Sequence, residues 1–173
     1  QRLSYVGELG YELYIKNNDA KSIYNSIIET GKKFKLSHCG AHTMDILRME
    51  SGFLHWGHDI SPEENQYQAG LNFTISYKKN LDFIGKNAVM KIKTQKFDKR
   101  FAMFVLKDSE PGNPLLLHEE PIYLDEKIIG KTTSGNYSFN YNKNLSFGYI
   151  ATMHTNEELK DKKFYIEIEK KKY

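Results

Sequence analysis

The chain has 173 residues, which is enough for one large domain or two small domains with hydrophobic cores. Hydrophobic residues make up 39% and aromatic residues 13%, as in folded rather than disordered proteins. The 25 Lys and Arg residues are interspersed with 22 Asp and Glu residues, so no basic surface for nucleic acid is predicted. Cys39 is the only cysteine and no apolar run approaches about 18 residues, which predicts a reducing intracellular compartment and excludes a membrane-spanning segment.

The opening stretch, SYVGELGYELY at residues 4–14, places an acidic residue, Glu8, between two glycines. Apolar residues alternate with polar ones on both sides, which predicts strands at residues 3–5 and 11–15. Gly7 and Gly10 permit the backbone angles of a tight connection. We therefore expect a hairpin with Glu8 at its tip. Because the chain starts at Gln1 inside this strand-like segment, we also expect it to come from a larger polypeptide.

Helical spacing of apolar residues predicts a helix that is capped by Asn18 and ends at Gly31. A second, shorter helix is predicted at residues 41–51, with Gly52 as its stop. Glycine, proline and asparagine then punctuate residues 57–70, GHDISPEENQYQAG, which predicts a long loop of the kind that often carries function. A strand at residues 73–77 and a short helix in KNAVMKIKTQ follow.

From about residue 96 the pattern changes to short strands separated by turn residues. These strands are FAMFVL, PIYL, KIIG, LSFGYI and FYIEIE, and the DE between PIYL and KIIG predicts a hairpin. Such a series is typical of a small antiparallel barrel or sandwich. The predicted fold class is therefore α+β, with one domain at residues 1–95 and a second, all-β domain at residues 96–173.

The sequence was compared with the known spacings of metal-binding, nucleotide-binding and nucleophile motifs. Cys39 and His42 are spaced C-x-x-H, and His55 and His58 are spaced H-x-x-H, which would suit tetrahedral zinc. Both pairs lie on segments with other structural interpretations, and zinc fingers usually carry paired cysteines, so we predict no metal site. No dinucleotide or triphosphate motif and no nucleophile elbow occurs.

Three other residues are candidates for ligand binding. The Glu8 carboxylate offers two coplanar acceptors, which suit a ligand edge with two parallel N–H donors such as a pterin, although an exposed turn residue is the alternative. Arg48 follows Asp45 by one helical turn, so it forms either a surface ion pair or an inward guanidinium that positions Glu8 or a ligand carboxylate. Trp56 is either a core residue or an aromatic face that stacks on a flat ring.

Four stretches together resemble the glycine cleavage T-protein (aminomethyltransferase) family. They are RLSYVGELGYELY, MDILRMESGFLHWGHDISPEE followed by AGL, LDFIGKNAV, and IGKTTSGNYSF followed by LSFGYI. The resemblance covers nearly the whole chain in the family's order. It implies that residues 1–95 are the C-terminal half of a folate-binding α+β domain and that residues 96–173 are the family's C-terminal β-barrel.

The resemblance also implies roles for individual residues. Glu8 and Tyr5 belong to the Y-x-G-E segment, whose glutamate holds the pterin edge of tetrahydrofolate in this family. Arg48 matches the arginine that faces the folate site, and Trp56 the aromatic residue before G-x-D. The family's catalytic aspartate lies upstream of these segments, so no catalytic residue is expected here and the isolated chain is expected to be inactive.

The Trp-Gly-His-Asp form of the turn is most similar to the folate domains of dimethylglycine and sarcosine dehydrogenases. This implies an upstream FAD domain in the same polypeptide that oxidises an N-methyl amine, after which the one-carbon unit is captured on tetrahydrofolate. A free T-protein, a folate-dependent demethylase and a non-catalytic folate-binding regulatory module remain alternatives. The implied partners are folate and an amine-derived one-carbon donor, and the implied location is the cytoplasm or the mitochondrial matrix.

Overall fold

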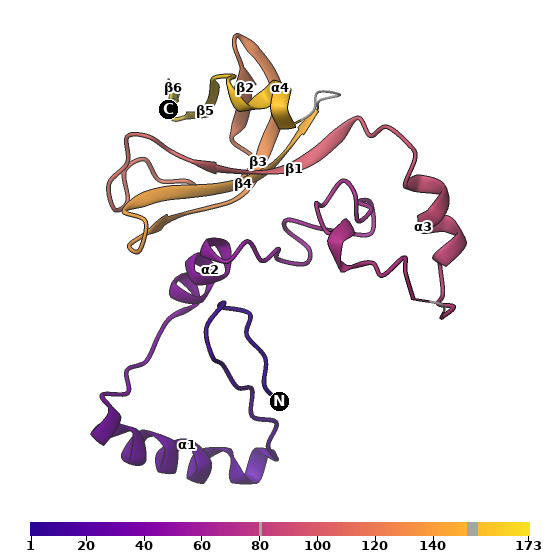
Figure 1. The fold of residues 1–173 in the computed structure, drawn as a ribbon. Coiled ribbons are helices and arrows are strands. Elements are labelled where there is room, and N and C mark those ends of the chain that lie inside the picture. The colour runs from indigo at the N-terminus through magenta and orange to yellow at the C-terminus, as the bar shows by residue number, and fades with distance from the viewer. Residues whose placement is uncertain (80, 152–155) are drawn as a thin grey trace. The chain divides into compact units, whose positions relative to one another are not determined.

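A computed structural model describes residues 1–79, 81–151 and 156–173 of the chain. These residues form two compact units, Gln1–Phe53 and Leu54–Tyr173, and each is considered by itself (Figure 1). The domain boundary expected near residue 96 stays a prediction, because a compact unit need not coincide with a domain. Over the described ranges, none of the helices combines the length and the hydropathy that a membrane crossing needs.

The first unit contains two α-helices, α1 (Asn17–Gly31) and α2 (Ala41–Glu50), and a short 3-10 helix, η1 (Lys32–Phe34). Both α-helices were predicted, and both end where their glycines indicated. The expected cap is wrong, because α1 begins at Asn17 with Lys16 in the N-cap position and no side-chain cap bond. No residue of α1 is buried, so this helix has little packing to hold it.

The opening loop is the clearest departure from expectation. The structure has no strand within residues 1–16, although the chain does double back as a hairpin would. The backbones of Gln1 and Glu12 exchange two hydrogen bonds of 2.8 Å, and no ladder extends beyond them. Leu13 and its apolar neighbour Tyr11 are exposed. A two-stranded ribbon without a third strand or a covering helix is marginal, which explains why the alternating pattern does not become a sheet.

The second unit begins with irregular chain that includes the predicted loop at residues 57–70. The strand expected at residues 73–77 is wrong, since a 3-10 helix, η2 (Asn72–Thr74), takes its place. Both the backbone N–H and the hydroxyl of Thr74 donate to the Leu71 carbonyl, at 3.0 and 2.7 Å, and this local bonding competes with strand pairing. The predicted helix is present as α3 (Lys86–Ile92).

The rest of the second unit is one antiparallel sheet of six strands with the order β1-β4-β3-β2-β5-β6, plus a short helix, α4 (Asn156–Lys160) (Figure 1). Its strands are β1 (Lys99–Val105), β2 (Pro121–Leu124), β3 (Lys127–Ser138), β4 (Lys143–Ala151), β5 (Phe164–Ile168) and β6 (Lys171–Lys172). Every strand expected after residue 96 is present, and the DE turn joins β2 to β3. The α+β fold class is confirmed.

The contact between β3 and β4 has two features that matter for the site. Gly148 lets the strands approach closely, since a Cβ there would lie 2.5 Å from the Lys131 carbonyl oxygen. One step further along, Thr132 pairs with Gly148 and Ser134 with Phe147, so Thr133 is an extra residue in β3. This insertion is a β-bulge, which bends the strand and redirects its side chains.

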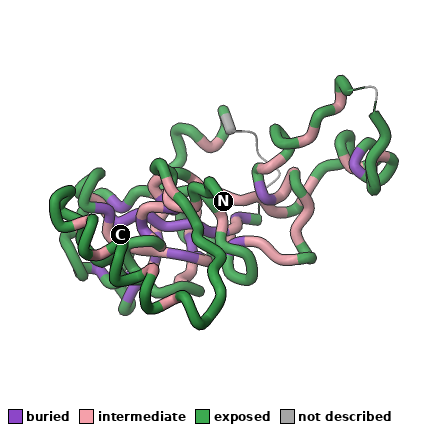
Figure 2. The backbone as a smooth tube through the Cα atoms, turned by 90° about the horizontal axis from the view of Figure 1, so that it is seen from below, coloured by how far each residue is buried: buried purple, intermediate pink, exposed green. Residues whose placement is uncertain are grey.

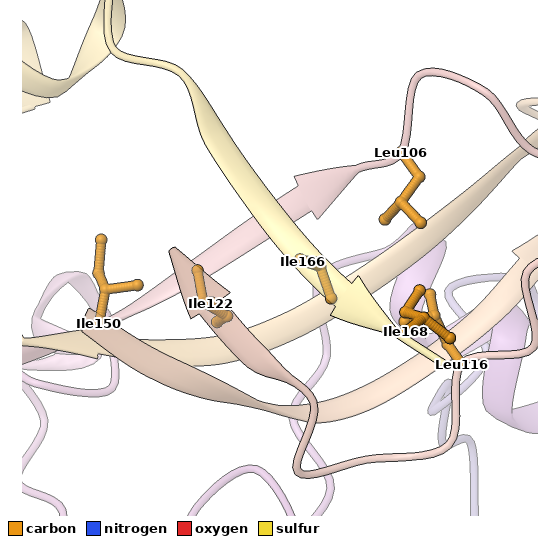
Figure 3. Packing of buried hydrophobic residues seen from close by; sticks show 6 residues of the cluster. All are labelled: Leu106, Leu116, Ile122, Ile150, Ile166 and Ile168. Carbon is orange, nitrogen blue, oxygen red and sulfur yellow. The ribbon is translucent and has the colours of Figure 1, made fainter. Parts of the chain in front are cut away.

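Most of the buried residues belong to the strands of the sheet and the connections beside them, and buried stretches of the tube gather near the C-terminus (Figure 2). Six of them form one hydrophobic cluster, in which β5 crosses in front of the other strands (Figure 3); they are Leu106, Leu116, Ile122, Ile150, Ile166 and Ile168. Because these side chains come from β2, β4, β5 and the connections beside them, the cluster packs several strands of the sheet together. The sheet therefore provides a rigid base for the loops of the second unit.

Candidate functional site

The loop at residues 1–12 carries Glu8, and the structure explains both glycines that frame it. Gly7 has a φ of +78°, and a Cβ there would lie 1.8 Å from the Ser51 hydroxyl, just beyond α2. A Cβ on Gly10 would lie 2.6 Å from the Leu3 carbonyl oxygen. Only glycine fits either position without displacing these neighbours. The loop is therefore closed on itself and lies against the end of α2.

The Glu8 side chain is exposed, whereas its backbone is held. The Ser4 hydroxyl donates to the Glu8 carbonyl and so fixes the turn at the loop tip. Within residues 1–79, 81–151 and 156–173, the Glu8 carboxylate has no hydrogen-bond or ion-pair partner. Both of its oxygens can therefore accept hydrogen bonds from a ligand. Tyr5, in the same loop, is half-buried.

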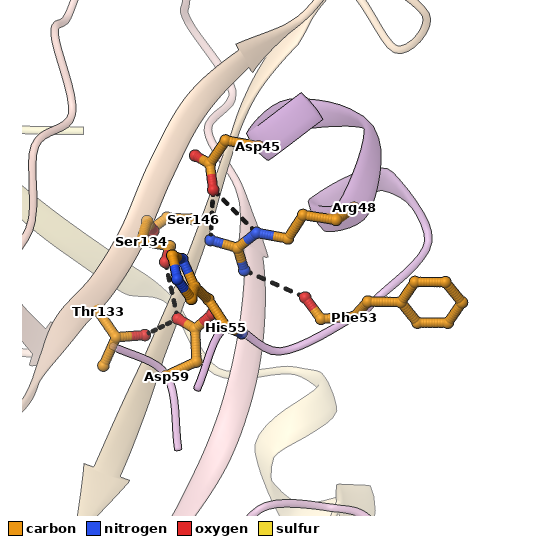
Figure 4. A network of polar contacts seen from close by, with 8 residues as sticks. All are labelled: Asp45, Arg48, Phe53, His55, Asp59, Thr133, Ser134 and Ser146. Atoms are coloured by element: carbon orange, nitrogen blue, oxygen red, sulfur yellow. Dashed lines mark hydrogen bonds and ion pairs between the residues drawn. The ribbon is translucent and has the colours of Figure 1, made fainter. Parts of the chain in front are cut away.

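Arg48 in α2 is only 1% exposed, so its interpretation as a surface residue is wrong. Its guanidinium donates to one carboxylate oxygen of Asp45 through Nε at 2.9 Å and through Nη2 at 2.7 Å. Nη1 donates to the Phe53 carbonyl oxygen at 3.1 Å. Arg48 thus joins α2 to the chain that follows it (Figure 4). This side chain acts as a brace for the segment beside the loop of Glu8.

Trp56 belongs to the second unit and lies in a tight turn. The N–H of Gly57 donates to the Ile60 carbonyl at 2.8 Å, and the N–H of Asp59 donates to the His55 carbonyl at 2.8 Å. The turn therefore holds the residue on each side of Trp56. The indole itself is 65% exposed, so its interpretation as a core residue is wrong. A face of the ring is available for stacking on a flat ligand.

Asp59 is the polar centre of this turn, a role that the sequence pattern did not predict. It is 1% exposed, and its Oδ2 accepts the His55 backbone N–H at 2.9 Å. Its Oδ1 accepts the hydroxyls of Thr133 and of Ser134, the latter at 2.8 Å (Figure 4). Adjacent strand residues normally point to opposite faces, and the bulge in β3 is what allows both hydroxyls to reach one carboxylate.

A groove of about 390 Å³ lies beside this centre and includes Asp59, Glu64, Lys99 and Tyr149. Lys99 Nζ lies 2.7 Å from Glu64 Oε1 and 5.2 Å from the centre of the Tyr149 ring. Burial by itself would raise the pKa of Glu64, but hydrogen bonds from Lys99 and Ser61 outweigh it and lower that pKa. Burial, followed by the charges of Glu64 and Asp59, raises the pKa of Tyr149 far above its ordinary value.

Replacing Tyr149 by Phe tests this groove. The Tyr149 hydroxyl is buried and has no hydrogen-bond partner among the described residues, so we expect Tyr149→Phe to leave stability at pH 7 unchanged or to raise it by about 1 kcal/mol. Folding raises the pKa of Tyr149 above the ordinary tyrosine value of about 10. The free energy of unfolding of the wild type is therefore unaffected by this group below about pH 10, and it falls as the pH rises further. Denaturant unfolding at several pH values should show a smaller alkaline loss in the variant.

Tyr123→Phe is the matched control, because the Tyr123 hydroxyl donates to Glu167 at 2.8 Å. This control should lose about 1 kcal/mol at pH 7. If Tyr149→Phe lost as much as Tyr123→Phe, the Tyr149 hydroxyl would have a bonding role that contradicts its unpartnered position.

The two residue pairs considered as zinc ligands lie in different units, Cys39 and His42 in the first and His55 and His58 in the second. Cys39 is an exposed free thiol. The rings of His55 and His58 lie 4.5 Å apart between centres. No group of three or more histidine, cysteine or acidic side chains has a metal-binding arrangement in the ranges that the structure describes.

The predicted folate contacts therefore fall into two groups. Glu8, Tyr5 and Arg48 lie in the first unit, on or beside one loop, and Trp56 lies in the second unit. The side chains of Glu8 and Trp56 are both exposed, and the roles of all four residues stay predictions. The residues that sequence reasoning missed are Asp59 and its two hydroxyl partners.

Comparisons with known proteins place this chain in a family. Residues 1–79 match the GCVT N-terminal domain, and residues 99–173 match the glycine cleavage T-protein C-terminal barrel domain. A 4-methylaminobutanoate oxidase (formaldehyde-forming) of Paenarthrobacter nicotinovorans is 41% identical over 136 residues, which are 79% of this chain and 16% of the oxidase. The mitochondrial dimethylglycine dehydrogenase of Homo sapiens is 36% identical over 152 residues, which are 86% of this chain and 17% of that enzyme.

A solved structure agrees with this result at the level of the fold. The glycine cleavage system aminomethyltransferase T from Bartonella henselae superposes with a TM-score of 0.80 at 20% identity, covering 99% of this chain and 45% of the solved one. The chain thus spans about a sixth of the length of the two curated relatives and under half of the solved structure. The two domain matches in succession show that the chain belongs to the glycine cleavage T-protein (aminomethyltransferase) family.

Proposed function

We propose that this chain binds tetrahydrofolate and takes part in the transfer of a one-carbon (methylene) unit from an amine donor to it. The main support is the succession of the two T-protein domains within one chain, together with relatives that include a dimethylglycine dehydrogenase. When bound, tetrahydrofolate would supply the nitrogen that accepts the methylene unit. The contribution of this chain is to bind and orient that acceptor, so its part in catalysis is positioning and electrostatics.

The residues fit such a ligand at the pterin edge. A pterin presents two parallel N–H donors, and the Glu8 carboxylate presents two coplanar acceptors that no described residue occupies. The exposed indole of Trp56 has an open face for a flat ring. Tyr5 accompanies Glu8 in the same loop. A pair of acceptors and an exposed aromatic face are thus suited to an aromatic heterocycle with paired N–H groups.

Arg48 has a supporting place in this proposal. Its Nε, Nη1 and Nη2 are already bonded to Asp45 and Phe53, so it acts mainly by holding the end of α2. Ser51, one turn beyond Arg48, is the residue against which Gly7 lies. In the proposed site, Arg48 therefore positions the loop that presents Glu8.

The proposed context is a larger polypeptide in the cytoplasm or the mitochondrial matrix. An upstream FAD-dependent domain would oxidise an N-methyl amine, and an aspartate outside this chain would serve as the acid–base group. The dimethylglycine dehydrogenase relative is named as mitochondrial, and this chain matches 17% of its length, which supports the location and the larger polypeptide. The oxidase relative favours a second candidate, in which the one-carbon unit leaves as formaldehyde. Product analysis with and without tetrahydrofolate separates the two.

Glu8→Gln is the test of ligand binding. The substitution turns one acceptor into a donor that faces an N–H, so we expect tetrahydrofolate to bind about 1–3 kcal/mol more weakly, which is roughly a 5- to 150-fold higher Kd. Isothermal titration calorimetry with tetrahydrofolate under reducing conditions measures it. Glu12→Gln is the matched control, because Glu12 is an exposed acid of the same loop whose carboxylate accepts the Tyr14 hydroxyl. Equal affinities for the wild type and Glu8→Gln would remove Glu8 from the site.

A further inference from the structure

Trp56 has an exposed side chain, but it lies in a turn whose backbone is fixed by hydrogen bonds. Its indole is 65% exposed, so side-chain packing contributes little to fixing it. The backbone on both sides is nevertheless held, since Gly57 bonds to Ile60 and the His55 carbonyl accepts N–H groups from His58 and Asp59. A fixed backbone limits the positions that the ring can reach, so the turn itself need not be ordered when a ligand binds.

The carboxylate of Asp59 attaches this turn to the sheet. Asp59 accepts the His55 N–H on one oxygen and the hydroxyls of Thr133 and Ser134 on the other. The first bond ties Asp59 to the residue before Trp56, and the other two tie it to β3. All of these residues belong to the second unit. A buried acceptor that links a turn to a sheet through three donors is a rigid connection.

We propose that Asp59 is a positioning residue that fixes Trp56 in the orientation used for ligand binding. The identity of that ligand as tetrahydrofolate rests on the proposed function, but the anchoring of Trp56 does not. Asp59 acts through the turn and not by touching the ligand. Thr133 and Ser134 take part because the β-bulge places both hydroxyls on the same carboxylate oxygen.

Fluorescence gives a direct readout, because Trp56 is the only tryptophan in the chain. The test variants are Thr133→Val and Ser134→Ala, each of which removes one hydroxyl and leaves the rest of the sheet in place. We expect the steady-state anisotropy of Trp56 to fall and its acrylamide quenching constant to rise by about twofold or more, as the turn gains local motion. Thr133→Ser keeps a hydroxyl and should restore wild-type values.

Thr132→Val is the matched control. The Thr132 hydroxyl also donates to a carboxylate, that of Glu120, from the same strand, but it does not support the Trp56 turn. This variant should lose stability without changing the anisotropy or the quenching of Trp56. If Thr132→Val mobilised Trp56 as much as Thr133→Val, or if neither Thr133→Val nor Ser134→Ala changed it, Asp59 would not position this residue.

Ligand binding completes the test and separates it from the proposed function. In Thr133→Val we expect tetrahydrofolate affinity to fall about fivefold, because part of the binding free energy would be spent on ordering the loosened turn. Mobile Trp56 with unchanged affinity would overturn the role of Asp59 in binding. That outcome would leave the folate proposal to its own test, Glu8→Gln, because Glu8 is on a separate loop.

Discussion

Replacing Phe147 by Ala should lower the free energy of unfolding of the second unit by about 3–5 kcal/mol. Phe147 is 0% exposed in β4, and its ring meets the edge of the Phe101 ring with 5.1 Å between centres. Truncation would remove apolar burial and leave a cavity that a paired sheet cannot close easily. Phe147 also pairs with Ser134 across the bulge, so the loss reaches the site.

Phe139→Ala provides the comparison, because Phe139 is a phenylalanine that is 72% exposed near the end of β3. Its removal should change stability by less than about 0.5 kcal/mol. Chemical denaturation followed by circular dichroism measures both variants. Similar losses for the two would mean that Phe147 is not packed as the structure shows.

The second large effect is expected from Arg48→Met. Methionine can fill much of the space. However, it leaves the Asp45 carboxylate and the Phe53 carbonyl without the N–H donors that Arg48 supplies to each of them. Losing one partner of a buried ion pair typically costs about 3–5 kcal/mol. Since Asp45 is partly exposed and can recover water, the lower end of that range applies. Hydrogen exchange of the α2 backbone amides should become faster by the corresponding factor.

Arg2→Met is the control for Arg48→Met, because Arg2 is an exposed arginine of the opening loop. It should leave the exchange rates in α2 unchanged. Tetrahydrofolate titration adds a second comparison, since Arg48→Met should weaken binding only as far as α2 opens. Unchanged exchange together with lost binding would show that Arg48 contacts the ligand directly and is not a brace.

The fold was most predictable where the pattern and the tertiary structure agree. The strands after residue 96 alternate in sequence and each has a neighbour to pair with, so all of them formed. The segments at residues 3–5 and 11–15 alternate as clearly, yet they lack a third partner and remain a loop. At residues 73–77 the local bonds of Thr74 prevail. Alternation predicts a strand only when something is available to pair with it.

The site was predictable only in part, for a related reason. The two glycines around Glu8 indicated a closed loop, and contacts with Leu3 and Ser51 now account for them. Asp59 is the last residue of the W-G-H-D motif, and its partners Thr133 and Ser134 belong to the T-T-S-G motif. However, 74 and 75 residues separate Asp59 from the two hydroxyls. Nothing local joins these motifs. A short polar residue after G-x and adjacent hydroxyls in a strand are the signal that could have suggested the contact.

The extra residue at Thr133 has a consequence for how this protein can vary. Deleting it would leave the pairs on either side, Thr132 with Gly148 and Ser134 with Phe147, in register, but it would remove the bend and one of the two hydroxyls that reach Asp59. Deleting a paired residue of β3 would instead shift the pairing of part of the strand by one position and turn those side chains to the opposite face, whereas a length change in the turn after Ser138 need not alter the pairing. Among natural variants we expect length changes to collect in the turn and to avoid the middle of β3.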